Sequence, residues 1–266
     1  MSQSTISPLK VSVSSTIKST TFLQKAEILS IKLQLAYCPS PADALTEFIL
    51  CYTENGLELL SHNTAKNKSN SLLFVDFVHG KNGYRRIQDA TIKQPLAKAV
   101  GIKPGIRPTV FDATAGLGGD AFVLATLGCH VTMCERNRVM VALLEDGLER
   151  ALLNPATRKI TQNYMKFVMS SSLLEKDNES QSFDSVYLDP MYPHDTGSAL
   201  NKMSMRVIRS LVGDDTDSWQ LMAQARGIAK KRIVVKRPRR APPLTDDKIS
   251  YQIKMKSSRF DIYIIS

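Results

Sequence analysis

The sequence of 266 residues lacks any apolar run that approaches the ~18 residues needed to span a membrane. Its first segment, Met1 to Lys10, also lacks the positively charged start and apolar core that mark a signal peptide. We therefore expect a cytoplasmic protein that has no membrane partner.

Cysteine and histidine are scarce, with four of each, and they are scattered along the chain rather than grouped at metal-binding spacings. A zinc site and a disulfide are therefore not expected. Cys129 and Cys134 flank or lie in an apolar segment, where a thiol packs as a small apolar side chain. Hydrophobic residues make up 43% of the chain and charged residues 23%, which indicates a globular protein.

Acidic residues are few relative to basic ones: the chain has 25 Asp and Glu residues and 35 Lys and Arg residues, which gives a net charge of +10. A basic balance favours an acidic partner, and nucleic acid is the commonest. The alternative is that the charge serves solubility alone.

Residues 1–80 are predicted to form a small α+β domain. Leu9–Val13 alternates like an edge strand, and Thr21–Ala36 has apolar residues at helical spacing. Glu54-Asn-Gly56 lies between two short apolar runs and indicates a hairpin. After a polar stretch expected to be a loop, Leu72–Val78 alternates like another strand.

Residues 81–108 are predicted to be a basic linker with a short helix near Pro95–Val100. Arg85 and Arg86 follow Tyr84, a mixture that suits contacts to phosphates and bases. A solvated connector is the alternative.

From residue 109 onward strands and helices alternate, which predicts a mostly parallel sheet with helices on both faces. A long helix is expected over Arg138–Leu153, whose apolar residues lie on one side. The stretch Thr109-Val-Phe-Asp-Ala-Thr-Ala-Gly-Leu-Gly-Gly-Asp120 passes from a buried strand, ended by Asp112, through a turn into a helix. The glycines of this turn are Gly116, Gly118 and Gly119. They allow a tight turn and close approach of a ligand to the backbone, as in nucleotide-binding βα units. The spacing is not G-x-G-x-x-G, so a tight connection without a ligand is the alternative.

Two further strands end in residues that suit a nucleoside cofactor. Glu135 ends the strand His130–Glu135, about 20 residues beyond the turn, where an acidic residue can accept hydrogen bonds from ribose hydroxyls. Ser171 and Ser172 follow the third strand, where their hydroxyls can reach an adenine edge or cap a turn. All these residues fall at carboxyl ends of strands, where open α/β sheets bind ligands.

The fourth strand ends at Asp189, within the segment Val186-Tyr-Leu-Asp-Pro-Met-Tyr-Pro-His194. This segment resembles the Asp/Asn-Pro-Pro-Tyr signature of S-adenosylmethionine-dependent amino methyltransferases. The Asp189 carboxylate and the Pro190 carbonyl can accept the N–H groups of a base amine, and Tyr192 can stack on the base. An Asp-Pro turn after a central strand is the alternative.

Basic residues recur in the C-terminal third. The run Lys230–Arg240 has seven basic residues in eleven and no acid, and an expected helix, Asn201–Leu211, is also basic. From these segments the predicted RNA contacts are Lys202, Arg206, Lys236, Arg237, Arg239 and Arg240. A solvated basic rim is the alternative for the run.

Several segments together resemble the small-subunit ribosomal RNA guanine-N2 methyltransferase J family. They are Asp112-Ala-Thr-Ala-Gly-Leu-Gly, Glu135-Arg-Asn, Tyr187-Leu-Asp-Pro-Met-Tyr-Pro-His, Ser210-Leu-Val-Gly and Val234-Val-Lys-Arg-Pro, with Phe74-Val-Asp-Phe-Val, Tyr84-Arg-Arg and Ala97-Lys-Ala-Val-Gly-Ile upstream. The resemblance covers roughly residues 72–266.

The resemblance implies a class I, Rossmann-like methyltransferase domain over residues 109–266, with an antiparallel last strand. It implies methyl transfer from S-adenosyl-L-methionine to the 2-amino group of one guanine in small-subunit ribosomal RNA. We expect the chain to be a monomer. The implied cofactor contacts are Gly119, Asp120, Glu135, Arg136, Ser171, Ser172 and Asp189. The family often has an arginine where Gly119 stands. A side-chain contact to the cofactor is therefore lost at this position, and only the backbone of Gly119 can contact it.

Three other functions are the alternatives. Methylation of another amine, adenine N6 or a protein glutamine, would use the same Asp-Pro-x-Tyr chemistry. A non-catalytic RNA-binding protein needs neither Asp189 nor Tyr192, whose presence disfavours it. A nicotinamide oxidoreductase is disfavoured by the glycine spacing and by the Asp-Pro-Met-Tyr segment.

Overall fold

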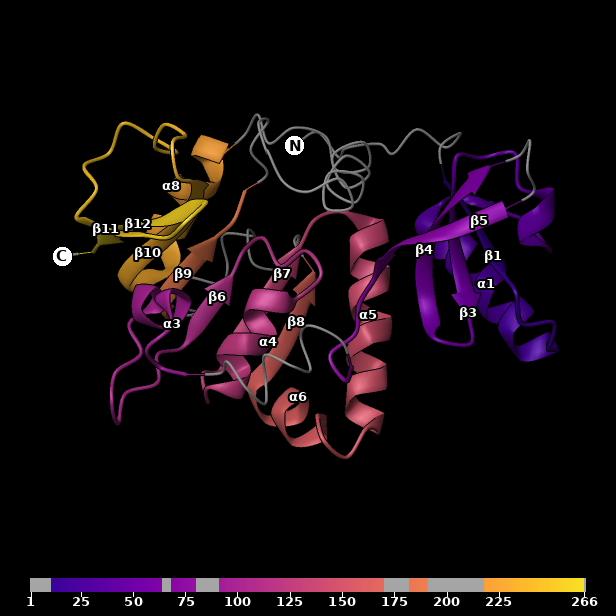
Figure 1. Cartoon of the computed structure of the whole chain (residues 1–266), viewed down its shortest axis with the longest axis horizontal. Coiled ribbons are helices and arrows are strands. Elements are labelled where there is room, and N and C mark those ends of the chain that lie inside the picture. Colours follow the sequence, from indigo (N-terminus) through magenta and orange to yellow (C-terminus); the bar gives the residue numbers. More distant parts are fainter. Residues whose placement is uncertain (1–10, 64–67, 80–90, 170–181, 191–217, 266) are drawn as a thin grey trace. The chain divides into compact units, whose positions relative to one another are not determined.

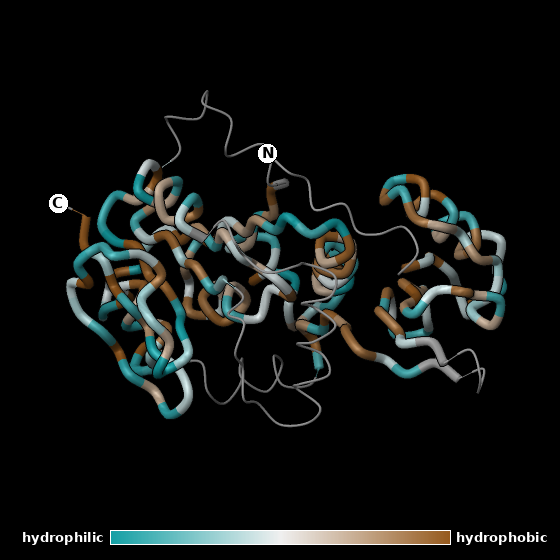
Figure 2. The backbone as a smooth tube through the Cα atoms, turned by 90° about the horizontal axis from the view of Figure 1, so that it is seen from above, coloured by the Kyte–Doolittle hydropathy of each residue, from teal (hydrophilic) through white to brown (hydrophobic). Residues whose placement is uncertain are grey.

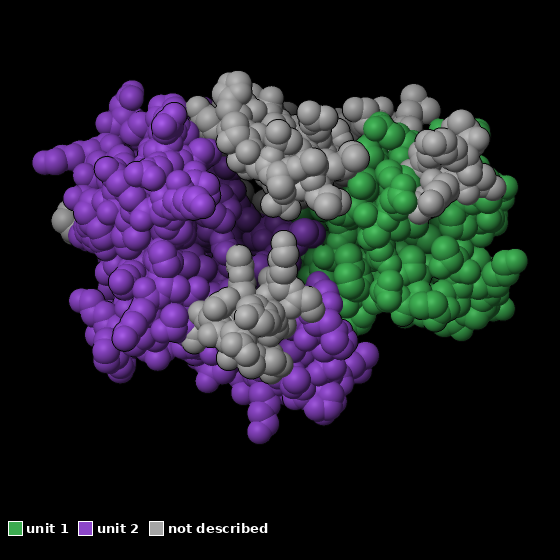
Figure 3. All heavy atoms as spheres, in the orientation of Figure 1, with its two compact units in different colours: residues 1–75, 137–150, 196–213 green, residues 76–136, 151–195, 214–266 purple. Residues whose placement is uncertain are grey.

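The computed structural model describes residues 11–63, 68–79, 91–169, 182–190 and 218–265. Contacts within the chain divide it into two compact units (Figure 3). The first comprises the described residues of 1–75 and 137–150, and the second those of 76–136, 151–195 and 214–266. The domain boundaries at residues 80 and 108 stay a prediction. No helix in the described ranges is long and apolar enough to cross a membrane.

The first unit is built on a five-stranded sheet of order β2-β1-β3-β4-β5. Its strands are β1 (Val11–Ser15), β2 (Ala36–Tyr37), β3 (Phe48–Thr53), β4 (Gly56–Asn63) and β5 (Lys68–Phe74). β1 is parallel to β2 and β3, whereas β3, β4 and β5 run antiparallel. Helix α1 (Thr20–Leu33) packs on β1, β2 and β3, and the single turn η1 (Pro41–Asp43) precedes β3.

The hairpin predicted around Glu54-Asn-Gly56 is confirmed, because β3 and β4 pair across this turn. Two predictions in this unit are wrong. β1 is an inner strand rather than an edge strand, since β2 pairs with its free side. β5 begins at Lys68, inside the polar stretch expected to be a loop, and ends at Phe74. Its pairing with β4 extends a strand over residues whose polarity alone favours a loop.

Helix α5 (Arg138–Leu153) has the predicted bounds. The Asn137 side chain caps it by accepting hydrogen bonds from the backbone N–H groups of Val139 (3.0 Å) and Met140 (3.1 Å). Gly147 lies inside the helix, where a Cβ would come within 2.2 Å of the Val75 side chain. The close approach of Val75 therefore requires glycine, although glycine costs about 1 kcal/mol in a helix interior.

The second unit contains a seven-stranded sheet of order β11-β12-β10-β9-β6-β7-β8 (Figure 1). Its strands are β6 (Val110–Asp112), β7 (Val131–Glu135), β8 (Met165–Met169), β9 (Phe183–Leu188), β10 (Ala229–Pro238), β11 (Tyr251–Lys254) and β12 (Ser258–Ile264). The pairs among β6, β7, β8, β9 and β10 are parallel, whereas β12 is antiparallel to β10 and β11. The predicted fold class, a mostly parallel sheet with an antiparallel last strand, is confirmed.

Helices cover both faces of this sheet. Val186 and Ile233 share one face with Met222 of α8 (Ser218–Ile228). On the opposite face the Ser185 hydroxyl donates to the Val100 carbonyl of α3 (Pro95–Val100), 2.7 Å away, and α4 (Gly119–Thr126) also lies there. Helix α6 (Arg158–Tyr164), which is not among the elements predicted from the sequence, packs beside α4 and leads into β8. Hydrophobic and hydrophilic stretches alternate along the backbone (Figure 2), as expected where each element has one face in a core.

Candidate active site

The carboxyl ends of four parallel strands bring the candidate residues to one edge of the second sheet. In register, Asp112 of β6 lies between Met133 of β7 and Tyr187 of β9. The chain order reverses at β6, because β7 lies on one side of it and β9 on the other. Ligands of open α/β sheets bind at such a switch point.

The glycine turn after β6 adopts backbone conformations that glycine favours. Gly116 has φ 55° and Gly118 has φ 74°, both in the left-handed region. The N–H of Gly118 donates to the Ala115 carbonyl at 2.8 Å, and α4 begins at Gly119. The helix therefore starts directly at the turn.

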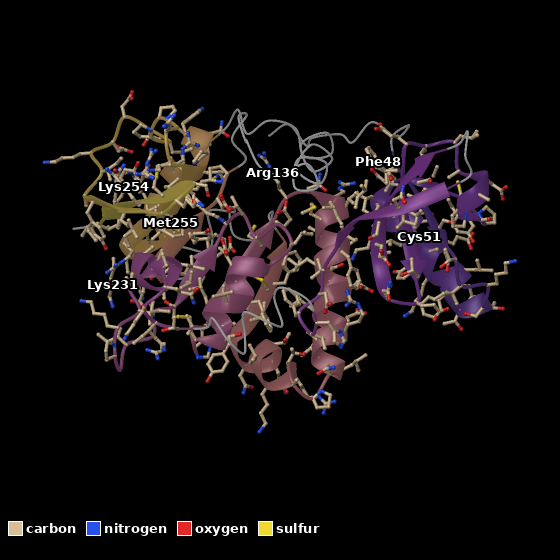
Figure 4. The ribbon with its side chains drawn as sticks, viewed as in Figure 1. Phe48, Cys51, Arg136, Lys231, Lys254 and Met255 are labelled. Carbon is tan, nitrogen blue, oxygen red and sulfur yellow. The ribbon has the colours of Figure 1, made fainter. Side chains whose placement is uncertain are left out.

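Glu135, at the end of β7, reaches this turn. Its carboxylate accepts hydrogen bonds from the backbone N–H groups of Gly116 and Arg136, each at 2.9 Å. Arg136 itself has an exposed side chain (Figure 4). A buried carboxylate held against the glycine turn matches the position predicted for binding ribose hydroxyls.

Asp112 is 2% exposed, and one of its carboxylate oxygens accepts the backbone N–H of Thr114 at 3.1 Å. Burial raises the pKa of the Asp112 carboxyl well above its usual value, and the nearby carboxylates of Asp120, Asp189 and Glu135 raise it further. Keeping Asp112 ionised at neutral pH therefore costs stability.

We expect Asp112→Asn to stabilise the protein increasingly as pH rises. A raised folded-state pKa means that the folded protein binds the proton more tightly than the unfolded chain does. The wild-type free energy of unfolding therefore falls as pH rises from the unfolded pKa towards the folded one. Thermal unfolding of both proteins across this range measures the effect. A constant difference at every pH would contradict it.

Lys236 joins two carboxylates at this edge. Its Nζ donates to Oδ2 of Asp189 at 2.7 Å and to Oδ2 of Asp120 at 3.0 Å. Burial lowers the pKa of Lys236, but the attraction of Asp189 and Asp120 outweighs burial, so the pKa lies above its usual value. The Tyr187 hydroxyl also donates to Asp120, at 2.6 Å.

Asp189 lies directly after β9, where Lys236 and the glycine-turn segment both hold it. Its backbone N–H donates to the Thr114 hydroxyl at 2.6 Å, and its carboxylate accepts from Lys236. Pro190, which follows it, is buried. Thr114 thus fixes the backbone of Asp189, and Lys236 of β10 holds its carboxylate.

The geometry changes the interpretation of two predicted RNA contacts. Lys236 is half-buried, and its Nζ is bound to the carboxylates of Asp120 and Asp189. Arg237 is 6% exposed, and its guanidinium donates to the Pro242 carbonyl at 3.0 and 3.1 Å. We therefore leave both out of the proposed phosphate-binding set. Arg239 and Arg240 are exposed, as a phosphate contact requires.

Sequence reasoning missed the pairing of Lys236 with Asp189, and it missed Tyr187. The strand register indicates this pair. Val234 and Val235 of β10 lie beside Tyr187 and Leu188 of β9, so the next residues of the two strands are Lys236 and Asp189.

The other predicted site residues lie outside the described ranges: Arg85, Arg86, Ser171, Ser172, Tyr192, Lys202 and Arg206. In the described ranges no group of three or more His, Cys, Asp or Glu side chains could hold a metal ion.

Comparisons with known proteins place this site in context. A family model described as "Putative SAM-dependent methyltransferase" matches residues 32–265. The crystal structure of a SAM-dependent methyltransferase from Neisseria gonorrhoeae matches with a TM-score of 0.65 and 30% identity, covering 95% of each chain.

Curated relatives are more similar in sequence. A ribosomal RNA small subunit methyltransferase J from Desulfotalea psychrophila is 51% identical over 82% of this chain and 83% of its own. A protein of the same name from Thioalkalivibrio sulfidiphilus is 45% identical over 91% of this chain and 93% of its own.

Proposed function

This chain belongs to the ribosomal RNA small subunit methyltransferase J family, and we propose that it methylates the exocyclic N2 of one guanine in small-subunit ribosomal RNA. It is a methyltransferase that uses S-adenosyl-L-methionine as methyl donor. With ribosomal RNA as partner, its place of action is the cytoplasm. That the chain acts as a monomer stays a prediction.

The residues at the carboxyl edge of the second sheet fit this cofactor. Glu135 is a buried carboxylate beside the backbone of the glycine turn, a donor and acceptor set suited to ribose hydroxyls. The proposed cofactor contacts among the described residues are Asp112, Gly116, Gly118, Gly119, Asp120, Glu135, Arg136 and Asp189. When bound, the cofactor supplies an electrophilic methyl group on a sulfonium sulfur.

The observation that carries the proposed mechanism is the placement of Asp189 at the end of β9, anchored by Thr114 and Lys236. The lone pair of a base amine is delocalised into the ring, so the amine is a poor nucleophile. Asp189 and the Pro190 carbonyl would accept its N–H groups, orient it and stabilise the positive charge that develops on nitrogen during transfer. Tyr192 would hold the base by stacking.

The test is methylation of unmodified small-subunit RNA, or of the small subunit, with isotopically labelled S-adenosylmethionine. We expect N2-methylguanosine as the labelled nucleoside in mass spectrometry. Labelled N6-methyladenosine, or label in protein glutamine, would replace the proposed substrate with one of the alternatives. A protein that binds RNA without transferring the label would be a non-catalytic relative.

Glu135→Ala should weaken binding of S-adenosylmethionine about tenfold or more. Each charge-assisted hydrogen bond that is lost costs on the order of 1.5–3 kcal/mol, and 1.4 kcal/mol is a factor of ten. Calorimetric titration measures the affinity, and thermal unfolding checks the fold, because Glu135 also holds the Gly116 N–H. Glu149→Ala, which removes an exposed carboxylate on α5, is the matched control. Equal affinities for the two variants would refute the ribose assignment.

A further inference from the structure

We propose that Arg239, Arg240, Lys254 and Lys256 form one phosphate-binding surface, the basic platform, which grips the backbone of the substrate RNA beside the active site. Of these four residues, only Arg239 and Arg240 are among the RNA contacts predicted from the sequence. The inference rests on the proposed function, because it names the surface that receives that substrate.

The start of β12 brings the two halves of the platform together. In register, Arg259 of β12 lies between Arg237 of β10 and Lys254 of β11. Beyond the strands, the N–H of Arg239 donates to the Ser257 carbonyl at 2.9 Å. The turn after β10 and the turn between β11 and β12 are therefore neighbours. All four platform side chains are exposed.

A buried ion pair fixes the turn that carries the two arginines. Arg259 and Asp261 are 5% and 0% exposed, and their side chains form hydrogen bonds of 2.7 and 2.9 Å. The Nη1 of Arg259 also donates to three carbonyls of the turn, those of Pro238 (3.0 Å), Arg239 (2.9 Å) and Ala241 (2.7 Å). These bonds offset the desolvation of the buried guanidinium.

This network holds the turn from inside while the arginine side chains reach solvent. With the carbonyls directed onto Arg259, the backbone carrying Arg239 and Arg240 is set before any ligand arrives. A surface ordered in advance loses less conformational entropy on binding. A basic rim that is only solvated would not require a buried ion pair to fix its backbone.

The platform lies at the same edge of the sheet as the methyl-transfer site. Lys236 contacts Asp189 just before the turn, whereas Lys231 lies at the opposite end of β10 (Figure 4). Residues 229–243 and 249–259 contain no acidic residue. Guanidinium and ammonium groups on such a surface suit the phosphates of RNA, which provide affinity independent of sequence.

The experiment compares two double variants by direct RNA binding at several salt concentrations. Lys254→Ala with Lys256→Ala removes two platform charges. Lys103→Ala with Lys230→Ala removes two exposed charges, one before β6 and one at the start of β10. Each phosphate contact contributes about 0.7–0.9 to the slope of log affinity against log salt, so the platform variant should lose roughly 1.4–1.8 of that slope. The control variant should keep the wild-type slope.

Methylation assays separate this inference from the proposed function. For the platform variant, kcat/KM for RNA should fall about tenfold, and the fall is expected in KM. Equal slopes for the two double variants would overturn the platform, even if both methylate RNA. Absence of RNA methylation by the wild-type protein would overturn the proposed function, while the binding slopes would still decide whether the platform grips phosphates.

Discussion

Replacing Asp189 with alanine is expected to lower the single-turnover rate of methyl transfer about 10²–10³-fold, the usual effect of removing one group that stabilises transition-state charge. The amine nitrogen becomes cationic as it takes the methyl group, so the interaction with a carboxylate strengthens along the reaction. Thr114 already fixes the backbone of Asp189 and Lys236 its carboxylate, so little reorganisation is needed when the charge develops.

Asp189→Asn is the informative companion variant. Asparagine keeps the size and one acceptor oxygen, so it can still orient an amine, but it lacks the negative charge. A rate between those of wild type and Asp189→Ala would separate orientation from charge stabilisation. A near-normal rate for Asp189→Ala, with cofactor affinity checked by calorimetry, would show that another group performs the transfer chemistry.

Lys236→Met should impair both the reaction and the fold. In the wild type, the carboxylates of Asp120 and Asp189 both bind the Nζ of Lys236. The substitution removes this shared cation from between them. Like charges at short range disfavour the ionised forms, so the acid limb of the pH–rate profile should move to higher pH. The free energy of unfolding should fall by about 1–3 kcal/mol, because the ion pairs are only partly buried.

The pH dependence of this loss has a definite sign. The folded-state pKa of Lys236 is raised, so its contribution is complete below the unfolded pKa and is lost only as pH rises through the folded one. The stability difference between wild type and Lys236→Met should therefore stay constant from about pH 6 to 9 and shrink only in strong alkali.

Lys236→Arg tests whether Lys236 acts by positioning Asp189. Arginine keeps the charge, so it should restore the pH–rate profile towards wild type. Lys230→Ala, an exposed lysine at the start of β10, serves as the control for loss of charge alone. If Lys236→Met kept the wild-type pH–rate profile and stability, the contacts to Asp120 and Asp189 would have no role in catalysis.

The amino-acid sequence by itself determined the local framework of the site. Apolar runs, and the residues that interrupt them, predict the elements of this framework: the strand Val110–Asp112, the glycine turn, β7 ending in Glu135 and β9 ending before Asp189. The bounds of α5 also follow, because its apolar residues recur at helical spacing. These features depend on neighbours along the chain, which a sequence displays directly.

Only the tertiary structure decided what the charged residues do. In the sequence Lys236, Arg237, Arg239 and Arg240 are one basic run, but the fold directs Lys236 onto Asp120 and Asp189, buries Arg237 and leaves the last two in solvent. A lysine has the same local signature whether it faces a phosphate or a carboxylate. Its partner here comes from another strand, so strand order and register, which are set by pairing between distant segments, choose its role.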